Sequence, residues 1–270
     1  MSDFNPYEKP QADVVSHMPP TSLSLHAPVR VPFGRGASWI AEAWTIFTRN
    51  GWLWIGGVLV LWLLSVVVGL VPLLGSILSV VLSPMIYAGA YMVAKKSDCG
   101  EEVRFEDFFA GFQTRAGMLA ALGGVSLVIM VALLAIGFAV GWVLLGGDAL
   151  STLATMEQTG TIPADAGAEG IKVLLLVLVI MALMIPFMAL IWFATPLLLF
   201  SEEMTLGRAL GWSLVGSLKN ILPMMLYGLL VIILMFVAII PLMLGLLVLL
   251  PLMFITVYTS FRDIYVDARA

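Results

Sequence analysis

Long runs without a charged residue divide the chain into alternating apolar and polar segments. Asp, Glu, Lys and Arg are missing from residues 50–94, 116–147, 173–201 and 220–261. Because a charge at the centre of a bilayer costs several kcal/mol, such runs predict membrane-spanning helices of about 20 residues each. The first and last runs are long enough for two spans. The pattern therefore predicts six transmembrane helices, over residues 52–71, 76–95, 117–145, 172–199, 221–240 and 244–262.

Turn residues lie near the centre of both double runs. Residues 72–76 read Pro-Leu-Leu-Gly-Ser, and Pro241 and Gly245 bracket the corresponding position in the last run. Proline and glycine are the residues expected at such turns. The six spans are therefore expected to form three hairpins.

A short amphipathic helix is predicted before each hairpin, over 38–50, 104–115 and 204–220. In the second, four phenylalanines recur at i, i+3, i+4 and i+7, which places them on one face of an α-helix. In the third, four leucines, Leu206, Leu210, Leu214 and Leu218, are aligned in the same way. Each segment ends with a basic residue directly before a span. The pattern thus predicts three repeat units, about 31–98, 101–200 and 201–267.

These helices supply the candidate interface residues. Such a face could dock a partner or lipid headgroups, or could lie in the membrane interface and orient the hairpins, since aromatic residues belong at that depth in either case. We favour the second interpretation. The aromatic and basic residues concerned are Trp39, Trp44, Phe47, Arg49, Phe105, Phe108, Phe109, Phe112, Arg115, Trp212 and Lys219.

Composition agrees with an all-α membrane protein. Of 270 residues, 61% are apolar and 11% are charged, and the mean hydropathy is +1.07. A soluble domain has about 25% charged residues, so a soluble or disordered protein is excluded. The net charge of −4 gives no basic excess for nucleic acid. A single cysteine, Cys99, excludes a disulfide framework.

The distribution of Lys and Arg predicts the orientation in the membrane. Every basic residue except Lys172 falls in segments on one side of the predicted spans, whereas the loop 147–171 carries Asp148, Glu157, Asp165 and Glu169. The positive-inside rule then places both termini in the cytoplasm and the acidic loop in the periplasm of a bacterial inner membrane. Residues 1–29 have no apolar signal-peptide core and are expected to form a disordered cytoplasmic tail before a membrane domain over 30–267.

Several motifs resemble an uncharacterised family of proteobacterial polytopic inner-membrane proteins. They are Arg35-Gly36 with Trp39, the run Phe105–Phe112, the segment Trp212–Asn220, and the closing Tyr258–Ile264. The resemblance covers residues 30–265. It implies a location and a fold, but no activity is assigned to this family, so it implies no catalytic or binding residues.

Residue patterns that would signal catalysis are missing from the sequence. There is no HExxH, GxSxG or P-loop, and the two histidines, His17 and His26, lie in the tail. The protein is thus not expected to be an enzyme or to need a cofactor or metal. The leading hypothesis is a non-catalytic accessory, scaffold or assembly component of a membrane complex. Its alternatives are a transporter or channel for an uncharged or hydrophobic solute or lipid, and a metal or stress sensor that uses the tail.

Overall fold

The computed structural model describes residues 23–72, 74–146, 154–155, 157–160 and 167–266. Within these residues the chain is helical, and the only β pairing is one bridge between Leu25 and Val266. The helices are α1 (Arg35–Arg49), α2 (Gly51–Gly69), α3 (Leu74–Cys99), the 3-10 helix η1 (Phe105–Phe112), α4 (Ala116–Leu145), α6 (Gly167–Ile191), α7 (Ala194–Phe200), α8 (Leu206–Lys219), α9 (Ile221–Ile239) and α10 (Leu246–Tyr265).

Six of these segments are long and apolar enough to cross a membrane. They are α2, α3, α4, the segment Gly170–Phe200 that joins α6 to α7, α9 and α10. Each coincides with a predicted span to within a few residues, so the prediction of six apolar spanning helices is confirmed. The turn residues also lie where expected, because α2 ends at Gly69 before Pro72 and α9 ends at Ile239 before Pro241.

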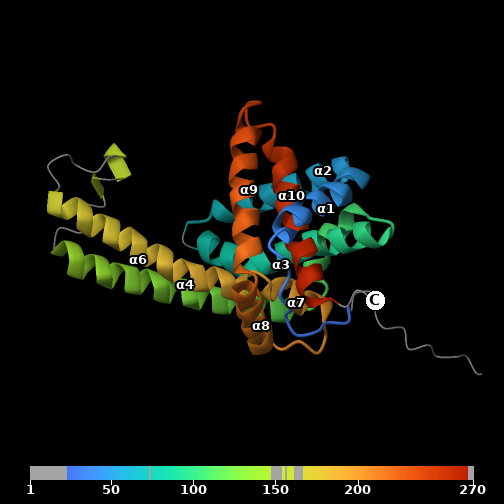
Figure 1. The fold of residues 1–270 in the computed structure, drawn as a ribbon, viewed down its shortest axis with the longest axis horizontal. Helices are drawn as coiled ribbons and strands as arrows, with labels where there is room; N and C mark the ends of the chain where they lie inside the picture. The colour runs from blue at the N-terminus through green and yellow to red at the C-terminus, as the bar shows by residue number, and fades with distance from the viewer. Residues whose placement is uncertain (1–22, 73, 147–153, 156, 161–166, 267–270) are drawn as a thin grey trace, which may run out of the picture.

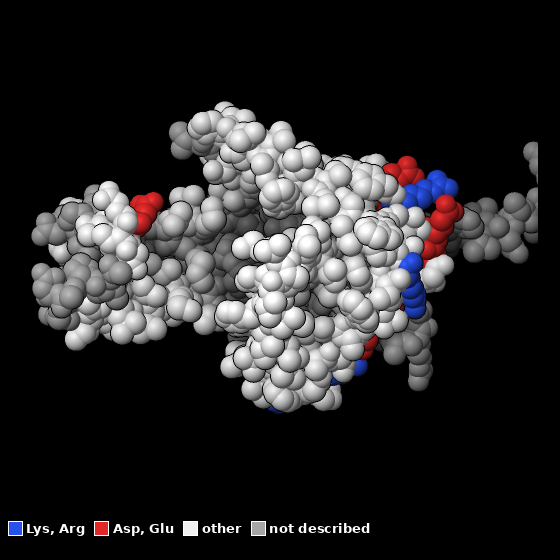
Figure 2. All heavy atoms as spheres, turned by 90° about the horizontal axis from the view of Figure 1, so that it is seen from above, with Lys and Arg blue, Asp and Glu red and all other residues white. Residues whose placement is uncertain are grey.

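The spanning helices diverge from a common packed region around the main hydrophobic core, which includes Trp39, Phe108 and Phe261. We call this region the base. Figure 1 shows α4 and α6 side by side, projecting far from the remaining helices, while α9 and α10 project in another direction. Seen from above, the apolar parts point away from an end where most of the visible charged residues gather (Figure 2). We call the pair α4 and α6 the long arm.

The spanning segments differ sharply in burial. In α3 and α10, 56% of the most apolar stretch is buried inside the protein, whereas the share is 22% in α2, 17% in α9 and in the Gly170–Phe200 segment, and 6% in α4. The base has a continuous core of large side chains, including Trp39, Phe108 and Phe261, each at most 1% exposed. The long arm has instead a small cluster of its own around Leu145, Val173 and Leu176.

The fourth span is broken where Pro196 removes a backbone donor. Proline has no N–H for the carbonyl four residues earlier, here that of Trp192, and α6 ends at Ile191 before α7 begins at Ala194. The hydroxyl of Ser213 on α8 repairs the break. It accepts a hydrogen bond from the Phe193 N–H at 2.9 Å and donates one to the Ala189 carbonyl at 2.8 Å.

The N-terminal segment crosses the base. The backbone N–H of Leu23 donates to the Phe200 carbonyl at 2.8 Å, and the N–H groups of His26 and Val29 donate to the last carbonyls of α10. Within the expected disordered tail 1–29, residues 23–29 thus include backbone hydrogen bonds to α7 and α10; residues 1–22, with His17, lie outside the described residues. On the other side, α6 begins at Gly167, within the expected loop 147–171.

Candidate functional site

The first amphipathic helix buries part of its apolar face. On α1, Trp39, Ala43, Ile46 and Phe47 are buried, and α1 packs against α9 and α10. The approach is close, because a Cβ at Gly36 would lie 2.2 Å from the backbone oxygen of Pro223 on α9. Of the predicted interface residues on this helix, Trp39 and Phe47 are thus core residues.

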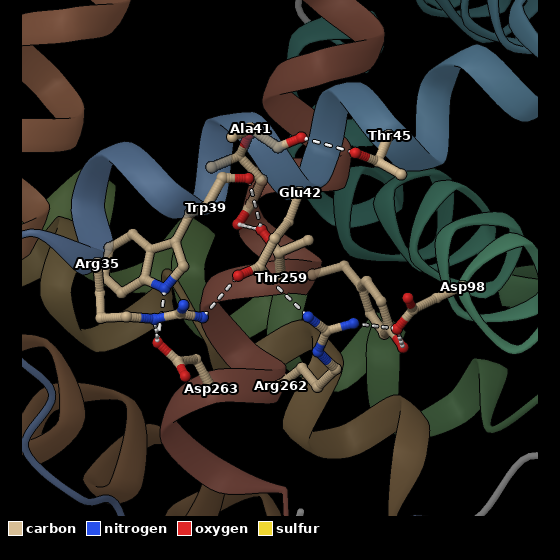
Figure 3. A network of polar contacts seen from close by, with 11 residues as sticks. Arg35, Trp39, Ala41, Glu42, Thr45, Asp98, Thr259, Arg262 and Asp263 are labelled. Carbon is tan, nitrogen blue, oxygen red and sulfur yellow. Dashed lines mark hydrogen bonds and ion pairs between the residues drawn. The ribbon is translucent and has the colours of Figure 1, made fainter.

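A network of ion pairs joins α1 to the ends of α3 and α10 (Figure 3). Glu42 on α1 bridges two arginines, with Arg35 Nη2 2.8 Å from its Oε1 and Arg262 Nη2 2.6 Å from its Oε2. Arg35 continues to Asp263 at 2.6 Å, and Arg262 continues to Asp98 at the end of α3. The network therefore ties together three helices from distant parts of the sequence.

Neutral donors complete the network. The indole N–H of Trp39 donates to Asp263 at 2.9 Å, and the Tyr258 hydroxyl donates to Asp98 at 3.1 Å. The hydrogen bond from Arg35 to Asp263, with the charges of Asp263 and Glu42, raises the pKa of Arg35 despite its partial burial. Each of the three carboxylates accepts from at least one cation, so the network can hold helices together but offers no unpaired carboxylate as a general base.

The three basic residues that precede spans all bind backbone carbonyls. Arg49 donates to the carbonyls of Ser97 and Asp98 at the end of α3. Lys219 donates to the Pro28 carbonyl at 3.1 Å, in the N-terminal segment that covers the end of α10. Ser97 and Asp98 lie in the last turn of α3, and a cation is favoured near a helix C-terminus.

Arg115 makes the most extensive of these contacts. Its backbone has a φ of 54°, in the left-handed region, immediately before α4. Its guanidinium donates to the carbonyls of Leu198 at 2.9 Å and Met204 at 3.0 Å, and also to that of Ser201. One side chain thereby closes the end of α7 and the turn that leads to α8.

The phenylalanine segment is not the α-helix that its spacing predicts. Residues 105–112 form a 3-10 helix with three residues per turn, so the four phenylalanines do not share one face. Phe108 is fully buried and contacts Trp54 edge to face at 5.5 Å, while Phe105 is 45% exposed. Phe109 and Phe112 are half-buried.

Backbone contact with α3 accounts for this tighter helix. A Cβ at Gly89 would lie 1.7 Å from the Phe108 carbonyl oxygen, and a Cβ at Gly111 would lie 1.9 Å from the Met85 carbonyl oxygen. The two backbones therefore touch directly at Phe108 and at Gly111, and this face of η1 is not free to dock a partner.

The third amphipathic helix buries mainly the small residues beside the leucine stripe, while Leu206 and Leu210 are only partly buried against the core. On α8 the buried residues are Ala209, Ser213, Gly216 and Ser217. The leucine stripe lies outside them, and its last member, Leu218, is 53% exposed. Small residues permit the close contact that the Ser213 hydrogen bonds to the α6–α7 break require. Trp212 is half-buried beside Arg208, which lies 5.1 Å from its ring centre.

The structure thus divides the predicted interface residues into two groups. Trp39, Phe47 and Phe108 are buried, and Arg49, Arg115 and Lys219 hold carbonyls within the base. Trp44, 51% exposed, and Phe105 remain at the surface, but on different elements. The sequence reasoning missed the ion-pair network, although its residues include the Arg35-Gly36 and Tyr258–Ile264 motifs. Comparison with protein-family models, curated proteins and solved structures finds no match to the chain.

Proposed function

We propose that the protein is a non-catalytic scaffold or assembly component of a complex in the bacterial inner membrane. The single observation that carries this proposal is the exposure of the long arm. A helix that is apolar on all sides needs lipid or another protein around it, and only 6% of the apolar stretch of α4 is buried inside this chain, where α4 packs against α3 and α6. An aromatic pair, Phe138 and Trp142, faces outward from it at 57% and 51% exposure.

Several features support a repeat of interfacial helix plus hairpin between the first and third units. Helices α1 and α8 have 15 and 14 residues, each is followed by one asparagine, Asn50 or Asn220, and each asparagine precedes a span of 19 residues. The tight turns also correspond. A Cβ at Gly75 would touch the backbone of Val68, and a Cβ at Gly245 would touch that of Ala238, seven residues earlier in both cases.

The charge distribution supports both termini being cytoplasmic. Most charged residues visible in Figure 2 gather at the base, and one acidic patch lies near the far end of the molecule. The N-terminal segment and the end of α10 pair with each other at the base through Leu25 and Val266. With the positive-inside rule, the base is the cytoplasmic end and the tip of the long arm is periplasmic. The predicted resemblance to a proteobacterial membrane family agrees with this location.

The base and the long arm have different roles in the proposed function. The ion-pair network and the carbonyl-binding cations fix the three hairpins to one rigid base. The long arm then presents apolar and aromatic surface within the membrane, where helices associate by packing and by interhelical contacts. We propose that this surface binds another membrane protein, and that the parts of the chain outside the membrane catalyse no reaction.

Purification from native membranes with a lipid-retaining polymer tests this proposal. We expect the full-length chain to co-purify with a membrane protein in fixed stoichiometry. The double variant Phe138→Ala, Trp142→Ala should lose that partner, whereas Phe236→Ala, which removes a 71% exposed ring on α9, should retain it. Recovery as an isolated monomer, or equal loss in both variants, would refute the role of the long arm.

A second candidate function, handling of a hydrophobic solute or lipid, is favoured by one groove. It has a volume of about 660 Å³ and an apolar lining from α1, α9 and α10, including Ala41, Leu234 and Leu252. A lipid-transfer assay in proteoliposomes checks this function. Transport should be lost when Ala41→Trp fills the groove, and a rate equal to that of protein-free vesicles would exclude it.

A further inference from the structure

A second pocket lies where the N-terminal segment passes the junction of α8 and α9. It has a volume of about 430 Å³, and its lining includes Arg30, Phe33, Lys219 and Leu222. Two of its lining residues are cations and none is a carboxylate. The pocket therefore combines positive charge with apolar walls.

The two cations are available for an anionic ligand. Arg30 is exposed and forms no ion pair or hydrogen bond with any residue that the structure describes. Lys219 donates one hydrogen bond, to the Pro28 carbonyl, and an ammonium group has three donors. Together the two side chains can supply several charge-assisted hydrogen bonds to a phosphate group.

The apolar residues that line the pocket indicate how deep in the membrane it lies. Ile221 is the first residue of an apolar span, so the cations lie at the boundary between that span and the charged base. Phe33, Leu218 and Leu222 are 57%, 53% and 49% exposed around them. A soluble phosphate would leave this apolar surface in water, but a lipid would cover it.

The face of α9 that leads away from the pocket is apolar as far as the large groove. At about 100° per residue, Leu222 and Ile233 lie on nearly the same face of the helix, about 16 Å apart along its axis. Ile233 lines the groove between α1, α9 and α10. That separation is close to the thickness of one leaflet of the hydrocarbon core, about 15 Å, so an acyl chain can reach from the pocket to the groove.

We propose that this pocket binds an anionic phospholipid, with the phosphate on Arg30 and Lys219 and an acyl chain along α9. Basic pockets beside membrane spans recognise anionic headgroups, and a zwitterionic lipid would find no carboxylate here for its amine. The site does not depend on the scaffold role of the long arm, which lies on other helices.

Native mass spectrometry of the full-length protein in detergent tests the site, with phosphatidylglycerol and phosphatidylethanolamine of the same acyl chains as probes. We expect tighter binding of phosphatidylglycerol. The double variant Arg30→Gln, Lys219→Gln should weaken its affinity by about fivefold for each charge removed, and should weaken phosphatidylethanolamine by less, because the amine of that lipid offsets its phosphate charge. Arg208→Gln, which removes the same charge from exposed α8, is the matched control and should leave both affinities unchanged.

Three outcomes would overturn the site. An equal loss in Arg208→Gln would mean diffuse electrostatic attraction, equal binding of the two lipids would remove headgroup selection, and displacement by millimolar glycerol phosphate would indicate a soluble anion site. If the double variant does not fold, Arg30→Gln alone decides, because this side chain has no polar partner among the described residues. In that case Arg30→Gln should weaken phosphatidylglycerol binding, and unchanged binding would overturn the site.

Discussion

The contact between η1 and α3 makes one substitution sharply testable. Gly89→Ala adds a single methyl group at a point where the Cβ would lie 1.7 Å from the Phe108 carbonyl oxygen. A carbon and a carbonyl oxygen approach no closer than about 3.3 Å. The methyl group therefore requires the two backbones to separate by roughly 1.6 Å, and the obstructing atom belongs to a backbone that has no alternative rotamer.

The expected cost follows from how tightly this region is packed. Separation of η1 from α3 also disturbs Phe108, which is fully buried against Trp54. Overpacking in a core typically costs 1–3 kcal/mol, and a clash with the backbone of a fully buried residue places Gly89→Ala at about 3 kcal/mol. For a chain of this size that corresponds to a fall in Tm of about 6–12 °C.

The matched control is the same substitution at an open position. A Cβ at Gly124, within α4, would have no heavy atom within 4 Å. Because alanine favours a helix over glycine by about 1 kcal/mol, Gly124→Ala should leave Tm unchanged or raise it slightly. Thermal unfolding in a mild detergent, followed by circular dichroism, measures both variants. Equal Tm values for Gly89→Ala and Gly124→Ala would refute the proposed backbone contact.

Three further predictions concern the polar contacts of the base, and each is read as a shift in Tm. Arg115→Met should cost about 3 kcal/mol because it removes a charged donor from three carbonyls, whereas Arg104→Met, at a side chain 63% exposed, should leave Tm nearly unchanged; equal shifts in Tm would contradict the capping role. Ser213→Ala should cost about 1–3 kcal/mol by leaving a buried N–H unpaired at the α6–α7 break, and an unchanged Tm would show that the break needs no repair. Glu42→Gln should cost about 1–2 kcal/mol, less than a fully buried ion pair because its partners are about 30% exposed. The raised pKa of Arg35 stabilises the fold at every pH below the ordinary pKa of arginine. The stabilisation by the ion pair between Arg35 and Glu42 should therefore stay constant from pH 6 to pH 10. A loss of this stabilisation within that range would contradict the account.

The spanning helices could be predicted from the sequence because a charge in the bilayer is costly. Three of the charge-free runs begin within one residue of the start of α2, α4 and α9. The turns could be predicted for a similar reason, since Pro72 and Pro241 cannot continue a helix. These signals are local, so a single sequence contains them.

The packing of the base could not be predicted from the periodicity of large apolar residues. In a membrane protein lipid is as apolar as the interior, so a stripe such as the leucines of α8 does not show which face is buried. The small residues carry that information. Gly111 and Gly216, both in amphipathic segments, lie at contacts too close for a Cβ, and they were the signal that could have identified the buried faces.

The ion-pair network depends on contacts between distant parts of the chain. Glu42 and Arg262 are separated by 220 residues in the sequence, and each has several charged neighbours on the same predicted side of the membrane. The positive-inside pattern places such residues at one level of the membrane, but it does not pair them. The pairing follows from the way α10 returns beside α1, which a single sequence does not show.

Site-specific photocrosslinking in native membranes tests the central claim, that the long arm binds another membrane protein, most directly. A photoreactive residue at Phe138, which is 57% exposed on α4, should capture one protein of defined mass. The same residue at Val140, which packs against the cluster between α4 and α6, should give only intramolecular products. Capture of lipid alone at Phe138 would contradict the account.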